Sequence, residues 1–229
     1  ADNLAAMLKL LPCGPNALMI QFAEAPGQAA FGIQQRLIAE LQRQPPTGLV
    51  EYIPAFTTLL LEFDPRHAND LNALASSLLP ALEQAAKETS ELPAPPVAVI
   101  DVVYDGPDLQ RVADHNHLSP AQVIELHAAP VYTVYQLGFM PGFPYLGDLN
   151  PLLRTPRLES PRTRVGAGSV AIGGEHTGIY SIDSPGGWNI VGRVSVKMFD
   201  PRRGTAGQEA GMFHLHAGDR VKFNPVPLP

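Results

Sequence analysis

The sequence contains a single cysteine, Cys13, which excludes an intrachain disulfide and any metal site built from several cysteines. Nothing in the surrounding stretch LPCGPN would lower the pKa of the thiol, so a buried or incidental role is expected rather than a nucleophile. A lone unpaired thiol fits the reducing cytoplasm, which is the predicted location.

Long apolar runs are also missing. No run of about 18 apolar residues occurs, so no membrane span is expected. The opening residues ADNLAAMLKLLPCG carry little basic character before a short apolar piece, so a signal peptide is not expected either. Apolar residues make up 45% of the chain and charged residues 17%, which is typical of a soluble globular protein.

Short motifs for phosphate binding and for a hydrolytic serine are absent. The chain has no G-x-x-x-x-G-K-[ST] loop and no G-x-S-x-G elbow. GAGSVA at residues 166–171 matches a relaxed dinucleotide fingerprint, but that mechanism requires a helix to begin there. The overlapping SVAIGG is typical of a strand and a turn, so the match is rejected.

Positive charge is scarce, with 16 Lys and Arg against 22 Asp and Glu, which argues against general nucleic-acid binding. Residues 1–130 hold 6 basic against 15 acidic residues, whereas residues 131–229 hold 10 against 7. Four arginines lie close together in the second part, at positions 154, 157, 162 and 164. They are equally consistent with an anion site and with surface ion pairs to the acidic part.

Only four of the 20 glycines occur in the first 100 residues, and this shift predicts two domains of different class. Within residues 1–104, the patterns predict strands at NALMIQF, GLVEYIPAF, TTLLLEF and VAVIDVVY. Apolar residues at helical spacing predict helices over QAAFGIQQRLIAELQRQ and DPRHANDLNALASSLLPALEQAAKE, with Pro80 a candidate kink or break. The order β-α-β-β-α-β predicts a ferredoxin-like, split βαβ domain.

Residues 105–130 are predicted to form a helical bridge. DLQRVADHN is a candidate short helix, and SPAQVIELH carries a capping box with Ser119 at the N-cap and Gln122 at N3. Residues 131–229 then alternate short strands with Gly and Pro corners, as in VYTVYQL, TGIYSI and GDRVKFNPV. This pattern predicts a sandwich or a closed barrel, and the whole chain is predicted to be α+β.

Two histidine pairs could place imidazoles on one face of a strand: His115 with His117, and His214 with His216. Neither pair has an obvious third ligand nearby. No metal is therefore predicted in this chain, and surface or capping roles are expected for the four histidines.

The glycine-rich stretch GGEHTGIYSIDSPGGW, residues 173–188, contains the residue types of a hydrolytic triad in His176, Asp183 and Ser184. Triads are defined by a geometry that sequence spacing does not fix. Hydrogen bonding of these polar groups to a ligand, with backbone amides exposed by the glycines, is the favoured interpretation.

Aromatic residues gather in LGFMPGFPYLGDLNP, which contains Phe139, Phe143 and Tyr145 between prolines and glycines. A rigid aromatic loop can line a pocket or dock onto a partner. A hydrophobic corner that closes one end of a barrel explains the same residues equally well.

The long segment VYQLGFMPGFPYLGDLNPLLRTPRLESPRTRVGAGSVAIGGEHTGIYSIDSPGGWNIVGR resembles one family. The family is that of the B-type subunit of 5-oxoprolinase, also labelled allophanate hydrolase subunit 1 or kinase inhibitor KipI. The likeness extends to ALMIQF, LLLEFDP, VIELHAAPVYTVYQLGF and the closing AGDRVKFNPV, so it covers most of the chain.

The resemblance implies a ferredoxin-like N-terminal domain and a cyclophilin-like β-barrel C-terminal domain. It also implies two partners, a C-type subunit similar to allophanate hydrolase subunit 2 and an A-type subunit of the LamB/YcsF kind. The complex would open 5-oxo-L-proline to L-glutamate with hydrolysis of ATP, which is expected to be shared with or bound by the partner subunits. No nucleic acid or membrane partner is expected.

A site for this chemistry needs cations for phosphate and carboxylate and oriented hydrogen bonds for the ring amide. Arg162, Arg164 and Arg193 are candidates for the anions. Candidates for the polar end and the walls of a pocket are Ser169, His176, Thr177, Tyr180, Ser184 and Trp188. Phe139, Phe143 and Tyr145 are candidates for partner binding, and the catalytic residues are not assigned.

Three positions depart from the family pattern: Gly166 and Ser181 stand where proline is common, and His176 where glutamine is frequent. These changes leave the predicted fold intact and bear on the identity of the substrate. Two alternative functions also fit the sequence. One is a KipI-like inhibitor of a sensor histidine kinase, and the other is half of a urea-type carboxyltransferase, which would need a separate biotin protein because a biotin-carrier lysine motif is absent.

Overall fold

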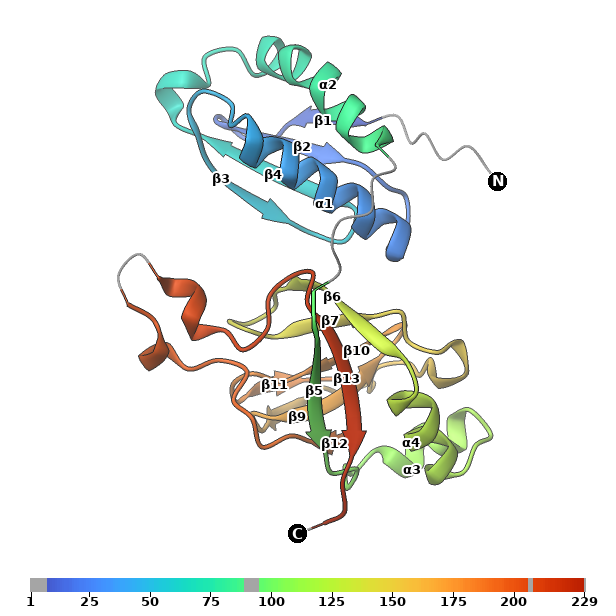
Figure 1. The fold of residues 1–229 in the computed structure, drawn as a ribbon. Helices are drawn as coiled ribbons and strands as arrows, with labels where there is room; N and C mark the ends of the chain where they lie inside the picture. Colours follow the sequence, from blue (N-terminus) through green and yellow to red (C-terminus); the bar gives the residue numbers. More distant parts are fainter. Residues whose placement is uncertain (1–7, 89–94, 206–207, 229) are drawn as a thin grey trace. The chain divides into compact units, whose positions relative to one another are not determined.

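The computed structural model describes residues 8–88, 95–205 and 208–228, and the chain divides into two compact units, Ala1–Pro93 and Ala94–Pro229. Figure 1 shows a sheet covered by two helices in the first unit and a strongly curved sheet in the second. Each unit has its own hydrophobic core. The predicted mixed α+β class is confirmed.

The N-terminal unit is a four-stranded antiparallel sheet in the order β1-β2-β4-β3. Its elements are β1 (Lys9–Pro12), β2 (Ala17–Gln21), α1 (Gln28–Arg43), β3 (Leu49–Pro54), β4 (Thr58–Phe63), the 3-10 turn η1 (Pro65–His67) and α2 (Leu71–Lys87). Alternate residues of β2 and β4, such as Leu18, Ile20 and Leu61, are fully buried. The two helices lie over one face of the sheet, as Figure 1 shows.

Both predicted helices of this unit are present, and α1 buries Leu37 and Leu41 at the predicted spacing. Asp70 caps α2 by accepting hydrogen bonds from the amides of Asn72 and Ala73. Pro80 lies inside α2, and the helix continues past it to Lys87. Pro80 therefore does not break the helix.

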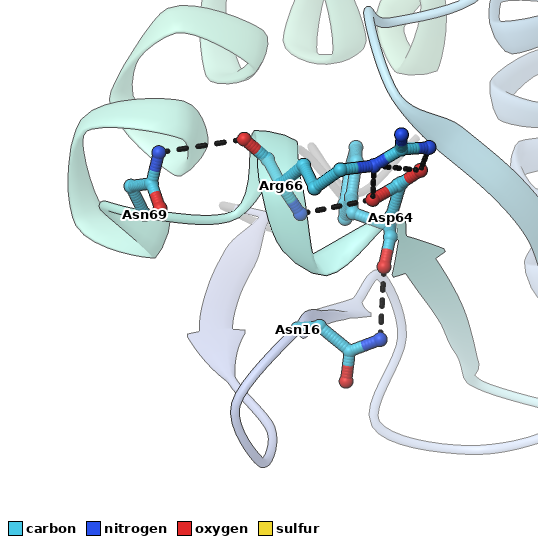
Figure 2. A network of polar contacts seen from close by, with 5 residues as sticks. Asn16, Asp64, Arg66 and Asn69 are labelled. Atoms are coloured by element: carbon cyan, nitrogen blue, oxygen red, sulfur yellow. Dashed lines mark hydrogen bonds and ion pairs between the residues drawn. The ribbon is translucent and has the colours of Figure 1, made fainter.

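A compact network of hydrogen bonds and an ion pair stabilises the turn between β4 and α2 (Figure 2). The Asp64 carboxylate accepts from the Arg66 amide and from two guanidinium nitrogens of Arg66, which lowers the pKa of Asp64 to about 2. The Asn16 side-chain amide donates to the carbonyl of Phe63, and that of Asn69 donates to the carbonyl of Arg66. These bonds stabilise the turn and connect the end of β4 to the segment between β1 and β2, so we assign the network a structural role.

The strand predicted at VAVIDVVY does form, as β5 (Val97–Val102), but in the second unit. It pairs in parallel with β13 (Arg220–Pro225), which lies near the end of the chain. The N-terminal unit therefore has the order β-β-α-β-β-α, and the predicted ferredoxin-like β-α-β-β-α-β arrangement is not confirmed. The boundary accordingly precedes β5, rather than following residue 104 as predicted. Apolar alternation indicates that a strand exists but does not say which sheet it joins.

The C-terminal unit is built on a seven-stranded sheet in the order β12-β9-β10-β7-β6-β13-β5, with a two-stranded sheet of β11 and β8 beside it. Its further strands are β6 (Val131–Leu137), β7 (Pro144–Gly147), β8 (Arg162–Val165), β9 (Ser169–Gly173), β10 (His176–Ile179), β11 (Ser184–Gly186) and β12 (Asn189–Arg193). Its helical elements are α3 (Leu109–His115), α4 (Pro120–Ala128), η2 (Pro151–Leu153), η3 (Pro201–Arg203) and η4 (Glu209–Met212).

A single antiparallel bridge between Val103 and Arg193 joins the two edges of this sheet, so that it nearly closes into a barrel. The two residues exchange backbone hydrogen bonds of 3.0 and 2.9 Å. Gly192 makes the approach possible, because a Cβ there would lie 2.6 Å from the carbonyl oxygen of Val103. The structure therefore confirms a nearly closed, barrel-like sheet. The more specific cyclophilin-like fold remains a prediction.

The predicted helical bridge, residues 105–130, contains both expected helices and packs onto the C-terminal unit. Ser119 and Gln122 form the predicted capping box at the start of α4. Val112 of α3 and Val123 of α4 are completely buried in the core of the second unit. We therefore describe this segment as part of that unit.

Candidate functional site

An aromatic pocket of about 280 Å³ opens on the C-terminal unit, where β7, β10 and the segment around β11 meet. We refer to it below as the aromatic pocket. Its lining residues are Phe139, Phe143, Tyr145, Arg157, Pro161, Tyr180, Pro185, Gly186, Gly187 and Trp188. Phe143 forms edge-to-face contacts with the rings of Tyr180 and Trp188, at centroid distances of 5.4 Å in both cases. The walls are therefore rigid and mostly apolar.

The glycines of the stretch 173–188 make room for these rings. A Cβ on Gly186 would lie 2.1 Å from the Tyr180 hydroxyl oxygen, and one on Gly173 would lie 2.4 Å from the Trp188 ring. Gly178 is similarly close to the Phe143 ring. The sequence suggested close approach to a ligand, whereas at these three positions the structure shows close approach to aromatic side chains.

Phe139 stands at the pocket in an unusual backbone conformation. Its φ of +66° lies in the left-handed region, which non-glycine residues rarely adopt, and its side chain is 65% exposed. The ring still makes edge-to-face contacts with Phe143 and Tyr180. The structure thus brings the aromatic residues predicted for partner binding together with the predicted walls Tyr180 and Trp188.

Neutral hydroxyl groups and a cation supply the polarity of the aromatic pocket. Burial raises the pKa of Tyr145 and of Tyr180 above the usual value of 10.0, so both phenols are uncharged at pH 7. The nearby positive charge of Arg157 opposes this rise in pKa for both groups. The Arg157 guanidinium lies over the Trp188 ring, 5.7 Å from its centroid.

The three arginines predicted to bind anions each have a carboxylate partner, and none lines the aromatic pocket. Arg162 contacts the buried Asp108 at 2.7 Å. Arg193 contacts Asp105 at 2.9 Å, next to the bridge between Val103 and Arg193 that nearly closes the sheet. The third, Arg164, binds the exposed carboxylate of Asp183 at 2.6 Å. Asp105 and Asp108 belong to the acidic part, residues 1–130, as the alternative of surface ion pairs predicted, whereas Asp183 lies in the second part of the chain. Arg157, which the sequence placed in the arginine cluster but not among the three anion-binding candidates, is the arginine that lines the pocket.

The predicted polar residues are dispersed. The Ser184 hydroxyl donates to the carbonyl of Pro185, and Ser169 is a half-buried residue at the start of β9. His176, on β10, is half-buried, and its pKa is lowered mainly by burial, against the raising effects of Glu175 and Asp148. None of these three residues lines the aromatic pocket, so the structure does not gather the predicted polar end around it.

Thr177, another predicted site residue, belongs to a buried network that the sequence analysis missed. The Tyr104 hydroxyl lies 2.7 Å from Nδ1 of His127, and Nε2 of the same ring lies 2.8 Å from Oγ1 of Thr177. Thr177 donates its one hydroxyl proton to the carbonyl of Ala171. Nε2 must therefore carry a ring proton. Because burial lowers the pKa of His127 to about 3, the ring is neutral near pH 7, so Nδ1 accepts from the Tyr104 hydroxyl.

A second hollow, of about 510 Å³ and more open, lies near the end of β7. Its lining residues are Leu126, Ala129, Pro130, Asp148, Leu149, Asn150, Pro151 and Arg154. Arg154 forms an ion pair with Glu175 at 2.8 Å, and Asp148 accepts a hydrogen bond from the Tyr135 hydroxyl at 2.8 Å. The charged groups of this hollow are thus largely paired within the protein.

Two negative observations apply to the described ranges, 8–88, 95–205 and 208–228. Within them, no three His, Cys, Asp or Glu side chains gather closely enough to hold a metal ion. None of the helices there has the length and apolar character needed to cross a bilayer.

Ser181, one of the departures from the family pattern, is 5% exposed, and its hydroxyl has no hydrogen-bond partner among the residues that the structure describes. A buried hydroxyl without a partner destabilises the fold, so Ser181→Ala should raise the free energy of unfolding by about 1 kcal/mol. Urea unfolding followed by the fluorescence of Trp188 measures this difference. Ser195→Ala, at an exposed position, should be neutral, and a loss of stability in Ser181→Ala would contradict the assignment.

The comparisons with known proteins agree with one another. Residues 8–207 match the family described as carboxyltransferase domain, subdomain C and D. The chain is 37% identical over 222 residues to a protein of Bacillus subtilis (strain 168) that is named as the B-type subunit of 5-oxoprolinase, covering 92% of this chain and 89% of the relative.

Two solved structures are also similar. One is TTHA0988, with a TM-score of 0.78 and 40% identity; the match covers 93% of this chain but only 41% of that one. The other is the urea amidolyase of K. lactis, with a TM-score of 0.77, of which this chain covers 15%. At 20% identity, the second likeness shows the fold alone.

Proposed function

The chain belongs to the carboxyltransferase-domain family that includes the proteins named as B-type subunits of 5-oxoprolinase, and from this we propose that it is the B-type subunit of an ATP-dependent 5-oxoprolinase. The observation that carries the proposal is the near full-length similarity to a protein of that name. In this proposal the enzyme opens 5-oxo-L-proline to L-glutamate in the cytoplasm, and this chain acts together with A-type and C-type subunits.

The chemistry explains why ATP is needed. A lactam carbonyl is a poor electrophile, and transfer of a phosphoryl group to its oxygen creates a leaving group that water can displace. A protein that takes part must hold a small, flat ring in one orientation and keep bulk water from its reactive carbon. The aromatic pocket supports this role, because its walls are apolar and fixed by edge-to-face contacts.

We assign the binding of ATP to the partner subunits. A phosphate site of the dinucleotide type needs a helix to begin at the glycine-rich loop. Residues 162–173 instead run as β8, a turn and β9. This chain then contributes the site for the ring substrate, with Tyr180 and Trp188 as walls and Phe139 at the entrance.

Reconstitution from purified subunits tests the proposal. The chain is mixed with ATP and 5-oxo-L-proline, with and without the A-type and C-type subunits, and glutamate and ADP are measured. We expect both products in the full mixture and none when any one of the three proteins is left out. An assembled complex, verified by size-exclusion chromatography, that forms no glutamate would contradict the proposed function.

The family match favours a second candidate, half of a carboxyltransferase that acts on urea-type amides. This candidate requires a separate biotin-carrying protein, because the sequence contains no biotin-carrier lysine motif. It predicts transfer of a carboxyl group from carboxybiotin to an amide by the assembled subunits, without formation of glutamate. The same purified subunits can be assayed for both activities.

A further inference from the structure

Arg157 differs from its neighbours in how its charge is compensated. Arg154, Arg162 and Arg164 form ion pairs with Glu175, Asp108 and Asp183 at 2.8, 2.7 and 2.6 Å. For Arg157, no carboxylate lies within 4.0 Å among the parts of the chain that the structure describes. Its guanidinium lies over Trp188 instead.

The position of Arg157 is fixed by backbone contacts on both sides. The carbonyl of Pro156 accepts a hydrogen bond of 3.0 Å from the side-chain amide of Asn189, a completely buried residue. The amide of Leu158 donates to the carbonyl of Gly187 at 2.7 Å. The segment is thereby tied to the same strand and turn that carry Trp188, so the cation is held at the aromatic pocket before any ligand arrives.

The surroundings of Arg157 offer no negative charge from the pocket itself. Apart from Arg157, the lining residues are aromatic residues, prolines and glycines. Burial raises the pKa of Tyr145 and Tyr180, so neither phenol becomes a phenolate near neutrality. A guanidinium stacked on an indole ring still presents the N–H groups at its edge, which suit a carboxylate in a bidentate arrangement.

We propose that Arg157 binds the carboxylate of a small ring-shaped acid whose flat face lies against the aromatic walls of the pocket. The pocket then selects for two features together, an anionic group and a compact, mostly apolar ring. This inference rests on the proposed function for the identity of the acid as 5-oxo-L-proline. Beyond the proposed function, Arg157 is the residue that recognises the carboxylate, and this chain binds the acid without its partner subunits.

The single tryptophan gives a direct readout, because Trp188 is both a wall of the pocket and the contact of Arg157. Three probes are titrated into the purified chain while its fluorescence is followed: 5-oxo-L-proline, cyclopentanecarboxylate and the neutral lactam 2-pyrrolidinone. We expect saturable changes with both acids. The neutral lactam should bind at least about 10-fold more weakly, because it lacks the charge-assisted hydrogen bonds.

Variants at Arg157 test the assignment. Arg157→Gln should weaken binding of both acids about 10- to 100-fold and leave the weak binding of 2-pyrrolidinone unchanged. Arg157→Lys keeps the charge but not the planar fork, so an intermediate affinity is expected. Arg202→Gln is the matched control, since Arg202 is exposed, pairs with Asp200 and does not line the pocket. Circular dichroism verifies that each variant is folded.

Three results would overturn the inference: no saturable change with either acid, equal affinity for 2-pyrrolidinone, or an unchanged affinity in folded Arg157→Gln. The reconstituted complex separates this failure from that of the proposed function. If the wild-type complex forms glutamate and Arg157→Gln leaves the KM for 5-oxo-L-proline unchanged, the inference fails and the function stands. If the isolated chain binds acids through Arg157 but the assembled complex forms no glutamate, the function fails and the anion site stands.

Discussion

Replacing Gly186 with alanine is expected to destabilise the C-terminal unit by about 2 to 3 kcal/mol and to abolish binding in the aromatic pocket. The added Cβ would lie 2.1 Å from the Tyr180 hydroxyl oxygen. The Tyr180 ring is 1% exposed and is held by edge-to-face contact with Phe143, so it can relieve this contact only by breaking that packing and shifting into the pocket that it lines. Urea unfolding followed by Trp188 fluorescence reports on this unit, because the chain contains no other tryptophan.

The neighbouring glycine supplies a matched control. A Cβ on Gly187 would lie 3.6 Å from its nearest neighbour, the Pro161 ring, which is an ordinary van der Waals distance. Gly187→Ala should therefore change the free energy of unfolding by no more than about 0.5 kcal/mol. Equal stability of the two variants would show that the Tyr180 ring yields, and would remove the argument for a rigid pocket wall.

Lowering the pH from 7 to 5 is expected to reduce the free energy of unfolding of the C-terminal unit by about 2 kcal/mol, through protonation of His127 in the unfolded chain alone. The imidazole is completely buried, and burial lowers the pKa of His127 from its usual 6.5 to about 3. Between these two values the unfolded chain binds a proton that the folded protein does not bind. Stability is therefore complete above about pH 6.5 and falls as the pH decreases toward the folded pKa.

Comparison with a variant isolates this contribution from the other titrating groups. His127→Gln has no titrating group at this position, so its unfolding free energy should decrease less steeply between pH 7 and 5 than that of the wild type. Urea unfolding at each pH, followed by Trp188 fluorescence, gives both curves. Parallel curves for the two proteins would contradict a buried neutral His127.

The same network predicts the effect of removing the Thr177 hydroxyl. Thr177→Val leaves the Nε2–H donor of His127 buried without an acceptor, which typically costs about 1 to 3 kcal/mol. Removal of the Ser181 hydroxyl is expected to have the opposite effect on stability, because the two hydroxyls differ in their hydrogen bonds. Both hydroxyls are buried, but that of Thr177 satisfies two partners, whereas that of Ser181 has none among the described residues.

Several elements could be predicted from the sequence because local forces determine them. The apolar spacing of α1 and the capping box of α4 involve residues within one or two helical turns of each other. The change in glycine content predicted two domains, and the chain does divide into two compact units. The long quoted motif identified the family, since a match of that length does not depend on any single residue.

The site was less predictable, because its decisive contacts join residues that are distant in the chain. Arg162 finds Asp108 54 positions away, and Arg193 finds Asp105 88 positions away. Nothing in the spacing of the arginines distinguishes these paired side chains from Arg157. Thr177 was predicted to belong to the site because it lies in the glycine-rich stretch 173–188. In the structure, its position on β10 directs the Thr177 side chain into the core, toward His127.

By itself the sequence determined the α-helices, many of the strands, the presence of two units and the family, because hydrophobic periodicity, capping and turn residues act over a few neighbouring positions. It did not indicate β1 or β7. The tertiary structure alone decided that β5 pairs with β13, that glycines accommodate aromatic rings rather than a ligand, and that Arg157 lies over Trp188 rather than against a carboxylate of the described residues. Each of these outcomes depends on which distant segments share a surface. That choice is made by the packing of the whole unit and leaves no local signal in the chain.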